Sequence, residues 1–407
     1  MPGSERAKDR EVWITGVGLA SSLGEGNAVH SDVLTGKRPA AASVDETTFA
    51  PYAVHRLVPL DLSRQIPKNS DQRQMEGWQR LGVYAAGQAL EDAGIKGRAD
   101  LLDRTDLVVA AGSGERDTAV DCRVLEASGA GNGAALRANE ILPSALRPTL
   151  FLAQLSNLLA GNISIVHHVT ASSRTFMGEE AAGLSAVENA FRRVAAGQCQ
   201  VCLVGGALNA ERDDLLLGYE LARQLWRHPF RRIGERDERG GGFVPGSVGA
   251  FLVLEERSHA EARSARPYAR IAAVETDAGG RRSDGGPLAR VVETVSGTVA
   301  QGTAAVFSGA SGVAPVTAAE LGLFRSLQIG GDIDYVWAYG DLLGHSVEAH
   351  FPAGVALAAL ALSAGSVSLG LVGGMAAVDE TSTVDRILVT TVGPWRGEGL
   401  ALLEAAP

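Results

Sequence analysis

Short apolar runs that end at glycine alternate along the chain with stretches of helical spacing. Residues 12–17 (VWITGV) and 107–111 (LVVAA) are runs of this kind, and each leads into a glycine-containing loop. Residues 79–93 place apolar side chains on one helical face, and residues 185–196 form a second expected helix, which Gly197 closes. This alternation predicts an α/β fold with a mostly parallel sheet and helices on both of its faces.

The second part of the chain repeats this order of elements. Residues 304–307, followed by SGASG, resemble residues 107–111, followed by GSGE. Two further runs, 387–392 and 400–403, correspond in the same way to runs 199–204 and 250–254. We therefore expect an internal duplication, with an N-terminal half at 1–255, a shortened C-terminal half at 267–407, and the charged stretch 256–266 as a linker.

Composition excludes several classes of function. The net charge of −10 disfavours a nucleic-acid partner. Three cysteines in 407 residues indicate a reducing compartment without a disulfide framework, and the polar N-terminus shows no targeting signal, so we expect a cytoplasmic protein. The sequence has no metal-ligand spacing and no P-loop, and we expect neither a metal nor a cofactor.

One uncharged stretch, residues 351–378, is long enough to cross a membrane. Proline or glycine interrupts it at positions 352, 354, 365, 370, 373 and 374. We therefore expect a buried helix at about 353–362, then a turn and an apolar strand or loop, in preference to a membrane span.

Four segments in chain order resemble the β-ketoacyl-ACP synthases. Residues 12–24 resemble the opening strand and loop of that family, 150–165 its dimer-interface helix and following strand, 175–206 its nucleophile helix and next strand, and 228–255 its Pro-Phe, Gly-Phe-Val, Gly-Ala, Leu-Glu block. The resemblance implies the thiolase-like fold, a five-layered αβαβα duplication that dimerises through a continuous sheet. The C-terminal half resembles the family less closely.

Glu180 stands where the family has its catalytic cysteine, as an ungapped count back from Gly205-Gly206 shows. A carboxylate cannot replace a thiolate as the nucleophile of transthioesterification. The family also uses two histidines. Tyr339, in Ala-Tyr-Gly, holds the first of these positions, and His345, in Gly-His, holds the second. The lysine that the family carries before Gly-His is absent, and the glycine-rich gating loop is replaced by Pro394, Trp395 and Arg396.

Two interpretations of Glu180 stay open. At a helix N-terminus, where backbone N–H groups favour an anion, Glu180 would plug a degenerate pocket as a fixed charge, with Arg174 as its expected partner. Alternatively, Glu179 and Glu180 are a solvated pair that only caps the helix. A lone histidine such as His345 is more often structural than catalytic.

The resemblance implies a ketosynthase-like subunit of fatty-acid or polyketide elongation that lacks its own condensing activity. In the family, such subunits, of which chain-length factors are an example, pair with an active synthase as a heterodimer and shape its acyl tunnel, and the synthase works with acyl carrier protein. Apolar residues of the interface segment would form the contact: Phe151, Leu155, Leu158 and Leu159. A malonyl-ACP decarboxylase or atypical 3-oxoacyl-ACP synthase, and a homodimeric acyl-binding scaffold, are the alternatives.

Overall fold

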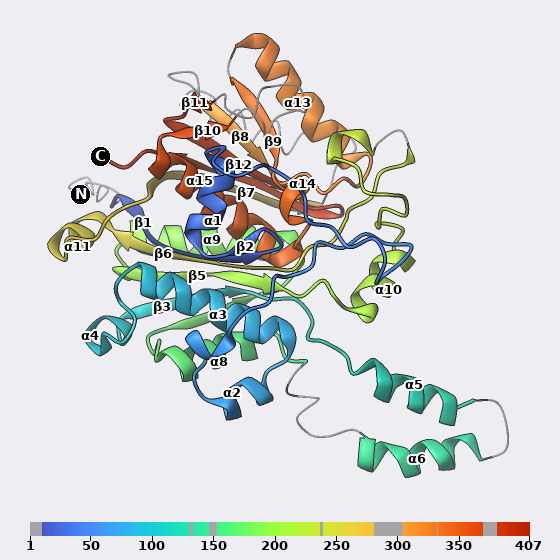
Figure 1. Ribbon diagram of the computed structural model, residues 1–407. Coiled ribbons are helices and arrows are strands. Elements are labelled where there is room, and N and C mark those ends of the chain that lie inside the picture. The colour runs from blue at the N-terminus through green and yellow to red at the C-terminus, as the bar shows by residue number, and fades with distance from the viewer. Residues whose placement is uncertain are drawn as a thin grey trace, which may run out of the picture.

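The computed structural model describes residues 10–129, 133–145, 152, 154–236, 239–280, 304–331, 333–368 and 381–407. Its centre is a mixed sheet in the order β4-β3-β5-β6-β1-β7-β13-β12-β8-β9, with β2 paired to β1 (Figure 1). Two runs of five strands meet where β1 pairs with β7. The first run consists of β1 (Val12–Ser21), β3 (Thr105–Ala110), β4 (Ser173–Phe176), β5 (Val201–Leu208) and β6 (Val248–Glu256). The second consists of β7 (Ala269–Gly280), β8 (Ala304–Ser308), β9 (Tyr335–Ala338), β12 (Arg386–Val392) and β13 (Arg396–Glu404).

The two runs have the same topology. In the first, β3 is parallel to both β4 and β5, and β6 is antiparallel to both β5 and β1. In the second, β8 is parallel to both β9 and β12, and β13 is antiparallel to both β12 and β7. Strands β3 and β8 are the elements that the sequence comparison paired, as are β5 with β12 and β6 with β13. The internal duplication is thus present in the fold, while the division of the chain at 256–266, which includes α11 (Arg257–Ala262), stays a prediction.

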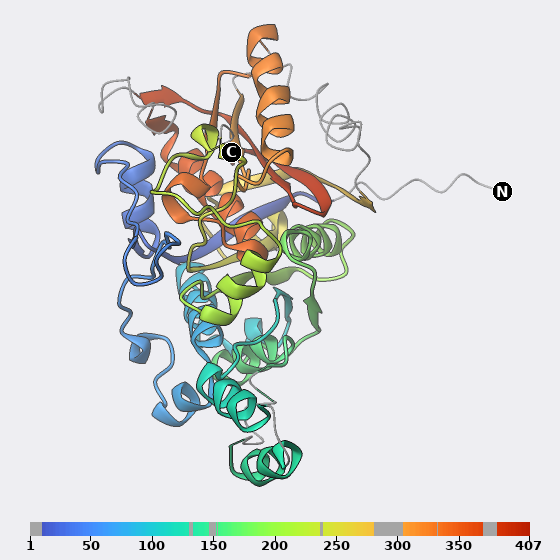
Figure 2. The same ribbon diagram turned by 90° about the vertical axis from the view of Figure 1, so that its right-hand side faces the viewer.

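Helices form three layers around these runs (Figures 1 and 2). Helices α3 (Gly77–Asp92) and α8 (Leu158–His167) cover the outer face of the first run. Helix α13 (Val316–Gly330) covers the outer face of the second. Helices α9 (Glu180–Ala195) and α15 (His350–Ala364) contact strands of both runs and form the middle layer. The result is the thiolase-like αβαβα arrangement.

Helix α15 accounts for the first part of the uncharged stretch 351–378, whose residues 369–378 lie outside the described part of the chain. Apolar side chains lie all round it, which suits a helix enclosed on every side. The segment Val347–Ala364 is the one described stretch that is long and apolar enough to cross a membrane, and 89% of it is buried inside the molecule. Gly365, at φ 70°, ends the helix in the left-handed conformation, and β10 (Ser366–Ser368) follows, paired with β11 (Thr381–Thr383).

The remaining elements include two surface helices and several short ones, of which α14 (Gly340–Leu343) and η4 (Val347–Ala349) are buried. Helices α5 (Thr118–Ala127) and α6 (Ala134–Ala145) project from the body as an arm (Figure 1). The shorter elements are β2 (Gly24–Glu25), α1 (Asn27–Leu34), η1 (Leu62–Arg64), α2 (Asn69–Gln74), α4 (Ala99–Leu102), α10 (Asp213–Leu221), η2 (Ile233–Glu235), α14 (Gly340–Leu343) and η4 (Val347–Ala349).

The segment 150–165 differs from the sequence interpretation. Helix α8 starts only at Leu158 and continues to His167, so the strand expected at the end of this segment is helical. The next strand is β4, which begins at Ser173. Phe151 lies outside the described residues.

Candidate functional site

A tight turn joins β4 to α9 and sets the position of Glu180. The strand ends at Phe176, and Gly178 and Glu179 both have positive φ, with Glu179 at φ 57° and ψ −138°. A non-glycine residue in this region costs about 1–3 kcal/mol and persists only where its surroundings enforce it. Glu180 follows as the first residue of α9 and is buried. The elbow expected from the sequence is therefore present, with a carboxylate at its tip.

Glu180 is paired with His345 across the molecule. His345 Nε2 lies 2.7 Å from Glu180 Oε1, and both side chains are at most 5% exposed. Glu180 is also the first residue of α9, at the positive end of the helix dipole. The solvated Glu179–Glu180 pair is thus ruled out for Glu180. Arg174, the partner expected from the sequence, is exposed on β4, so that prediction was wrong.

The Gly-Phe-Val block holds His345 in place. The His345 N–H donates to Val244 O at 2.8 Å, and Gly246 N–H donates to His345 O at 3.0 Å. The Phe243 ring lies 5.0 Å from the imidazole, between ring centroids. These contacts fix the backbone and the ring of His345, so that its side chain points at the start of α9.

Tyr339 lies behind His345 rather than beside Glu180. It is fully buried after β9, and its hydroxyl donates to the carbonyl oxygen of His350 at 3.2 Å. Gly309 and Gly354 leave room for the phenol, since a Cβ on either would lie less than 3 Å from it. The side chain at the first histidine position is therefore directed to a backbone carbonyl.

His350 connects these groups and was missed in the sequence. Its ring lies 4.4 Å from that of His345 and 4.5 Å from that of Tyr339, between centroids. Burial, followed by the charge of His345, holds the pKa of His350 well below its usual value. The signal available was its position five residues after His345, at the start of the uncharged helix.

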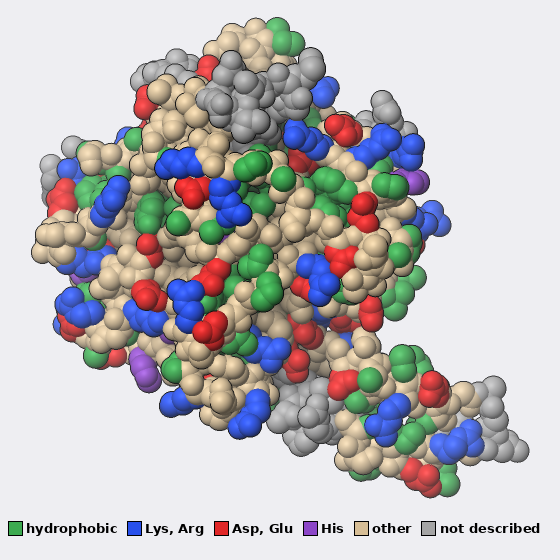
Figure 3. Space-filling view, viewed as in Figure 1, with side chains coloured by type: hydrophobic (Ala, Val, Ile, Leu, Met, Phe, Trp, Pro, Cys, Tyr) green, Lys and Arg blue, Asp and Glu red, His purple; other side chains and the backbone are tan. Residues whose placement is uncertain are grey.

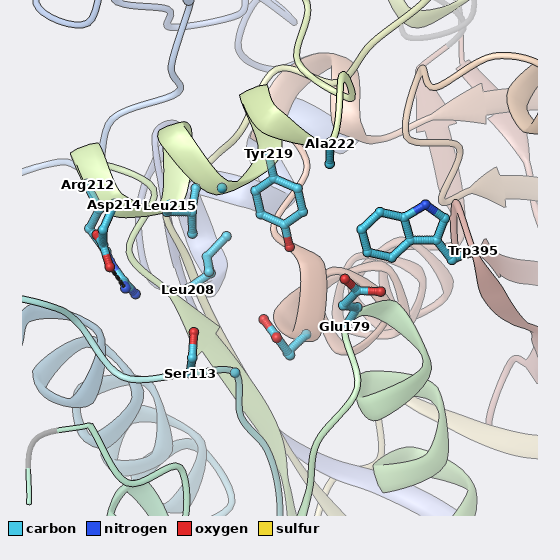
Figure 4. A pocket seen from close by; sticks show the side chains of 12 residues that line it. Ser113, Glu179, Leu208, Arg212, Asp214, Leu215, Tyr219, Ala222 and Trp395 are labelled. Carbon is cyan, nitrogen blue, oxygen red and sulfur yellow. Dashed lines mark hydrogen bonds and ion pairs between the residues drawn. The ribbon is translucent and has the colours of Figure 1, made fainter.

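A cavity of about 260 Å³ opens beside the elbow (Figure 4). Its walls come from the loop after β3, the elbow, the end of β5, α10, η4 and the turn between β12 and β13. The lining residues are Gly112, Ser113, Glu179, Leu208, Arg212, Asp214, Leu215, Gly218, Tyr219, Ala222, Glu348 and Trp395. In Figure 4, Ser113, Glu179 and Tyr219 point toward the same central space.

Two features of the cavity bear on the sequence interpretation. Trp395 belongs to the expected gating loop, is 55% exposed and stands at one side of the cavity, next to the partly buried Pro394. The side chain of Arg396 is outside the described part of the chain. Glu348, which the sequence did not single out, is buried, and its burial, assisted by the charges of Glu180 and Glu179, raises its pKa to about 7.

No thiol lies at this site. Cys122 is exposed on α5, whereas Cys199 and Cys202 are buried at the beginning of β5. Within the described residues, no group of three or more His, Cys, Asp or Glu side chains is arranged to hold a metal ion. The described site therefore offers carboxylates, imidazoles and phenols, but no thiolate nucleophile.

The expected interface residues have different environments. Leu155 and Leu158 are partly buried at the start of α8. Leu159 is fully buried and packs against α3 at Gly82, so it has no surface to offer a partner. Other large apolar side chains near this region are exposed instead: Leu125, Leu136, Leu152, Ile165 and Met177.

Comparison with known proteins places the chain in a family. The family model "Beta-ketoacyl synthase, N-terminal domain" matches residues 9–260, and the chain belongs to this β-ketoacyl synthase family. It is 27% identical over 270 residues to 3-oxoacyl-[acyl-carrier-protein] synthase 2 of Vibrio cholerae, covering 64% of this chain and 62% of that one. It is 25% identical over 300 residues to a putative polyketide β-ketoacyl synthase 1 of Streptomyces halstedii, covering 70% and 68%.

Solved structures show the same fold over nearly the whole chain. The ishigamide ketosynthase/chain length factor matches with a TM-score of 0.77 at 20% identity, covering 98% of this chain and 100% of that one. A β-ketoacyl synthase from Burkholderia phymatum matches with a TM-score of 0.75 at 17% identity, with the same coverage. A type II polyketide ketosynthase in complex with its acyl-carrier protein matches with a TM-score of 0.70 at 17% identity, again with the same coverage. The thiolase-like fold thus extends into the C-terminal half, where the sequence resemblance is weaker.

Proposed function

We propose that this chain is a non-condensing ketosynthase-like subunit that pairs with an active β-ketoacyl-ACP synthase and shapes its acyl tunnel. The observation that carries the proposal is the buried Glu180–His345 hydrogen bond at the elbow. It occupies the place of the family's nucleophile with a carboxylate and engages the one retained histidine position. Fatty-acid and polyketide elongation both fit, and the cytoplasm, a reducing compartment, suits the free thiols.

The free edge of the first run of strands and the arm support the proposal of a protein partner. Strand β4 ends the first run and, among the described strands, pairs only with β3, while its Ser173 and Arg174 side chains are exposed. An open strand edge is a template for pairing with another chain. The arm of α5 and α6 adds exposed Leu125 and Leu136, and Figure 3 shows apolar side chains interspersed with charged ones on this arm. Exposed apolar surface of this kind marks interfaces.

A basic segment supports the proposal that acyl carrier protein is the second partner. Arginines at positions 223, 227, 231, 232 and 239 are at least partly exposed between α10 and β6. Lys and Arg side chains gather over this region in Figure 3, although the chain as a whole carries a net charge of −10. The segment begins beside Ala222, which lines the cavity. A partner with an acidic surface would be steered to this entrance.

The alternatives are less well supported. Decarboxylation of malonyl-ACP would need donors to the enolate oxygen. The Tyr339 hydroxyl is directed to His350 O instead, and the carboxylates of Glu179, Glu180 and Glu348 would repel the malonyl charge. A homodimeric acyl-binding scaffold would use the same β4 edge, and the experiment below distinguishes it from the heterodimer.

Co-expression with an intact synthase from the same genome tests the pairing. We expect the two chains to co-purify. Three variants should separate them and change the length of the product that the synthase makes: the double variant Leu125→Asp with Leu136→Asp, the single variant Leu155→Asp, and the single variant Phe151→Asp. Ile329→Asp is the matched control, because Ile329 is 89% exposed on α13, in the outermost layer of the second run. Assembly and product profile that are unchanged in all of the first variants would refute the proposed face, and a stable dimer of this chain alone would favour the scaffold.

A further inference from the structure

The cavity beside the elbow is lined by charged groups of both signs. Arg212 is its lining cation, and its guanidinium is bound to Asp214, with Nε 3.0 Å from Oδ1. A second nitrogen of Arg212 also bonds Asp214 and donates to Gly114 O at 2.9 Å. Because Arg212 and Asp214 neutralise each other, the charge of Glu348 is not compensated by this pair.

Glu348 is the most unusual of these groups. Its side chain is only 6% exposed, yet it lines the cavity. Among the described residues, the carboxyl group has no hydrogen-bond partner except its own backbone N–H. A Cβ at Gly112 would lie 2.5 Å from Glu348 Oε1, so the glycine there makes room for this carboxyl group. A buried carboxyl group without a side-chain partner is costly unless a ligand satisfies it.

Aromatic rings stand on two sides of the same space. Tyr219 on α10 points its hydroxyl into the cavity, and Trp395 stands opposite, beside Glu179 (Figure 4). Carboxylates combined with aromatic faces suit a cation, because the rings attract positive charge through their quadrupoles while the carboxylates pair with it. An acyl chain would bind poorly against such polar walls.

We propose that this cavity binds a small organic cation, a primary ammonium group on a ligand of a few heavy atoms, held between Glu348, Tyr219 and Trp395. The volume of about 260 Å³ limits the ligand to a size below that of most drug-like molecules. The inference concerns this chain alone and does not depend on its pairing with a synthase. The proposal assigns a class of ligand to the cavity beside the elbow.

The site makes binding pH-dependent. The groups that face Glu348 are Glu179 and Glu180 at the start of α9, Arg212 with Asp214, and the Tyr219 hydroxyl, which burial keeps protonated. The pKa of Glu348 is raised to about 7, so below that pH the carboxyl group is protonated and cannot pair with an ammonium group. Affinity for a cation should therefore rise about tenfold between pH 6 and pH 8.

Isothermal titration of the purified full chain, alone or with its partner, with three isosteric probes tests the proposal. The probes are n-propylammonium, n-propanol and propionate. We expect saturable binding of n-propylammonium only, in the millimolar range, with the pH dependence given above. Glu348→Gln should weaken it about tenfold or more. Asp213→Asn removes one exposed carboxylate from the same helix outside the cavity and is the matched control, expected to change affinity less than about twofold.

A second variant keeps the proposal testable if Glu348→Gln fails to fold. Trp395→Leu removes a ring from an exposed turn and should weaken n-propylammonium binding about threefold to tenfold without loss of structure. Equal binding of n-propanol or propionate would overturn the proposal. So would the absence of saturable binding, an affinity that does not change between pH 6 and pH 8, or an affinity that neither Glu348→Gln nor Trp395→Leu changes.

Discussion

Glu180 and His345 are 165 residues apart in sequence and share a buried hydrogen bond of 2.7 Å. The bond joins the first residue of α9, which follows a strand of the first run, to the loop that precedes α15, which follows a strand of the second. The middle layer of the fold is thus tied together at the tip of the elbow. The predictions below follow from this arrangement and from the groups around it.

Removal of the Glu180 carboxylate should destabilise the protein. In Glu180→Ala, His345 Nε2 loses its partner while Nδ1 already has none among the described residues, so the free energy of unfolding should fall by about 1–3 kcal/mol. Glu180→Gln keeps an acceptor and should cost less. Urea unfolding at pH 8 measures both changes. Equal stability of Glu180→Ala and the parent protein would show that the bond contributes nothing.

Purified chain should not take up acyl groups from acyl-ACP. None of its three cysteines is at the elbow, and hydrogen bonding to Cys199 together with burial raises the pKa of Cys202 well above its usual value, which disfavours the reactive thiolate. Intact-protein mass spectrometry after incubation with acyl-ACP is the measurement. A stoichiometric adduct on Cys122, Cys199 or Cys202 would contradict the account.

A cysteine at the elbow should not restore condensation. In Glu180→Cys, Tyr339 would still stand at the expected first histidine position with its hydroxyl directed to His350 O. It cannot replace a neutral histidine as donor and base, so one of the family's two histidines would still be missing. Elongation of a labelled acyl-ACP is the assay, with Glu180→Ala as the control for background. Clear turnover by Glu180→Cys would show that the second half supports chemistry as it stands.

Acid should destabilise the protein through its buried histidines. Burial lowers the pKa of His30 and His167 to about 4 and that of His55 to about 3, and it holds that of His350 well below its usual value. Each binds its proton more weakly in the folded than in the unfolded chain, so stability is lost as pH falls below about 6.5. Glu348 acts in the opposite sense, because its raised pKa favours the folded state at low pH and this contribution is lost as pH rises from about 4.5 to 7. Burial also raises the pKa of Asp92 and Asp341, which act in the same sense as Glu348 but start from the lower ordinary pKa of Asp. We therefore expect the four histidines to dominate and stability to fall on acidification.

A single histidine variant measures the size of this effect. His167→Gln should reduce the loss of unfolding free energy between pH 6.5 and pH 4.5 by about 2–3 kcal/mol. His228→Gln, at a partly exposed side chain, is the matched control and should leave the loss unchanged. A pH profile of His167→Gln that overlays that of the parent protein would contradict the assignment of this histidine as buried and neutral.

Local patterns predicted the fold because strand runs, glycine turns and helix spacing repeat in both halves. The count back from Gly205-Gly206 placed Glu180 at the elbow, since the helix and strand between them have no insertion. The contact partners of these residues were harder to predict from the sequence. Arg174 was expected beside Glu180 because it is near in sequence, yet a residue six positions back on β4 points to solvent, while His345 reaches the site from the other half.

The burial of individual side chains could not be predicted from the sequence either. Leu159 reads as an interface residue because leucines surround it, but it faces α3 within its own chain. The walls of the cavity come from six separate segments, so no motif joins Glu348, Tyr219 and Trp395 in the sequence. Only the packing of α10, η4 and the β12–β13 turn brings them together.

The most direct test is a reconstituted elongation assay with labelled malonyl-ACP and four preparations. These are the chain alone, an intact synthase alone, the pair, and the pair in which the nucleophilic cysteine of the synthase is changed to alanine. The account predicts that the pair with the intact cysteine makes product of a length that the synthase alone does not, and that the chain alone and the cysteine-less pair make none. Product from the chain alone or from the cysteine-less pair would show that this chain condenses, and would contradict the account.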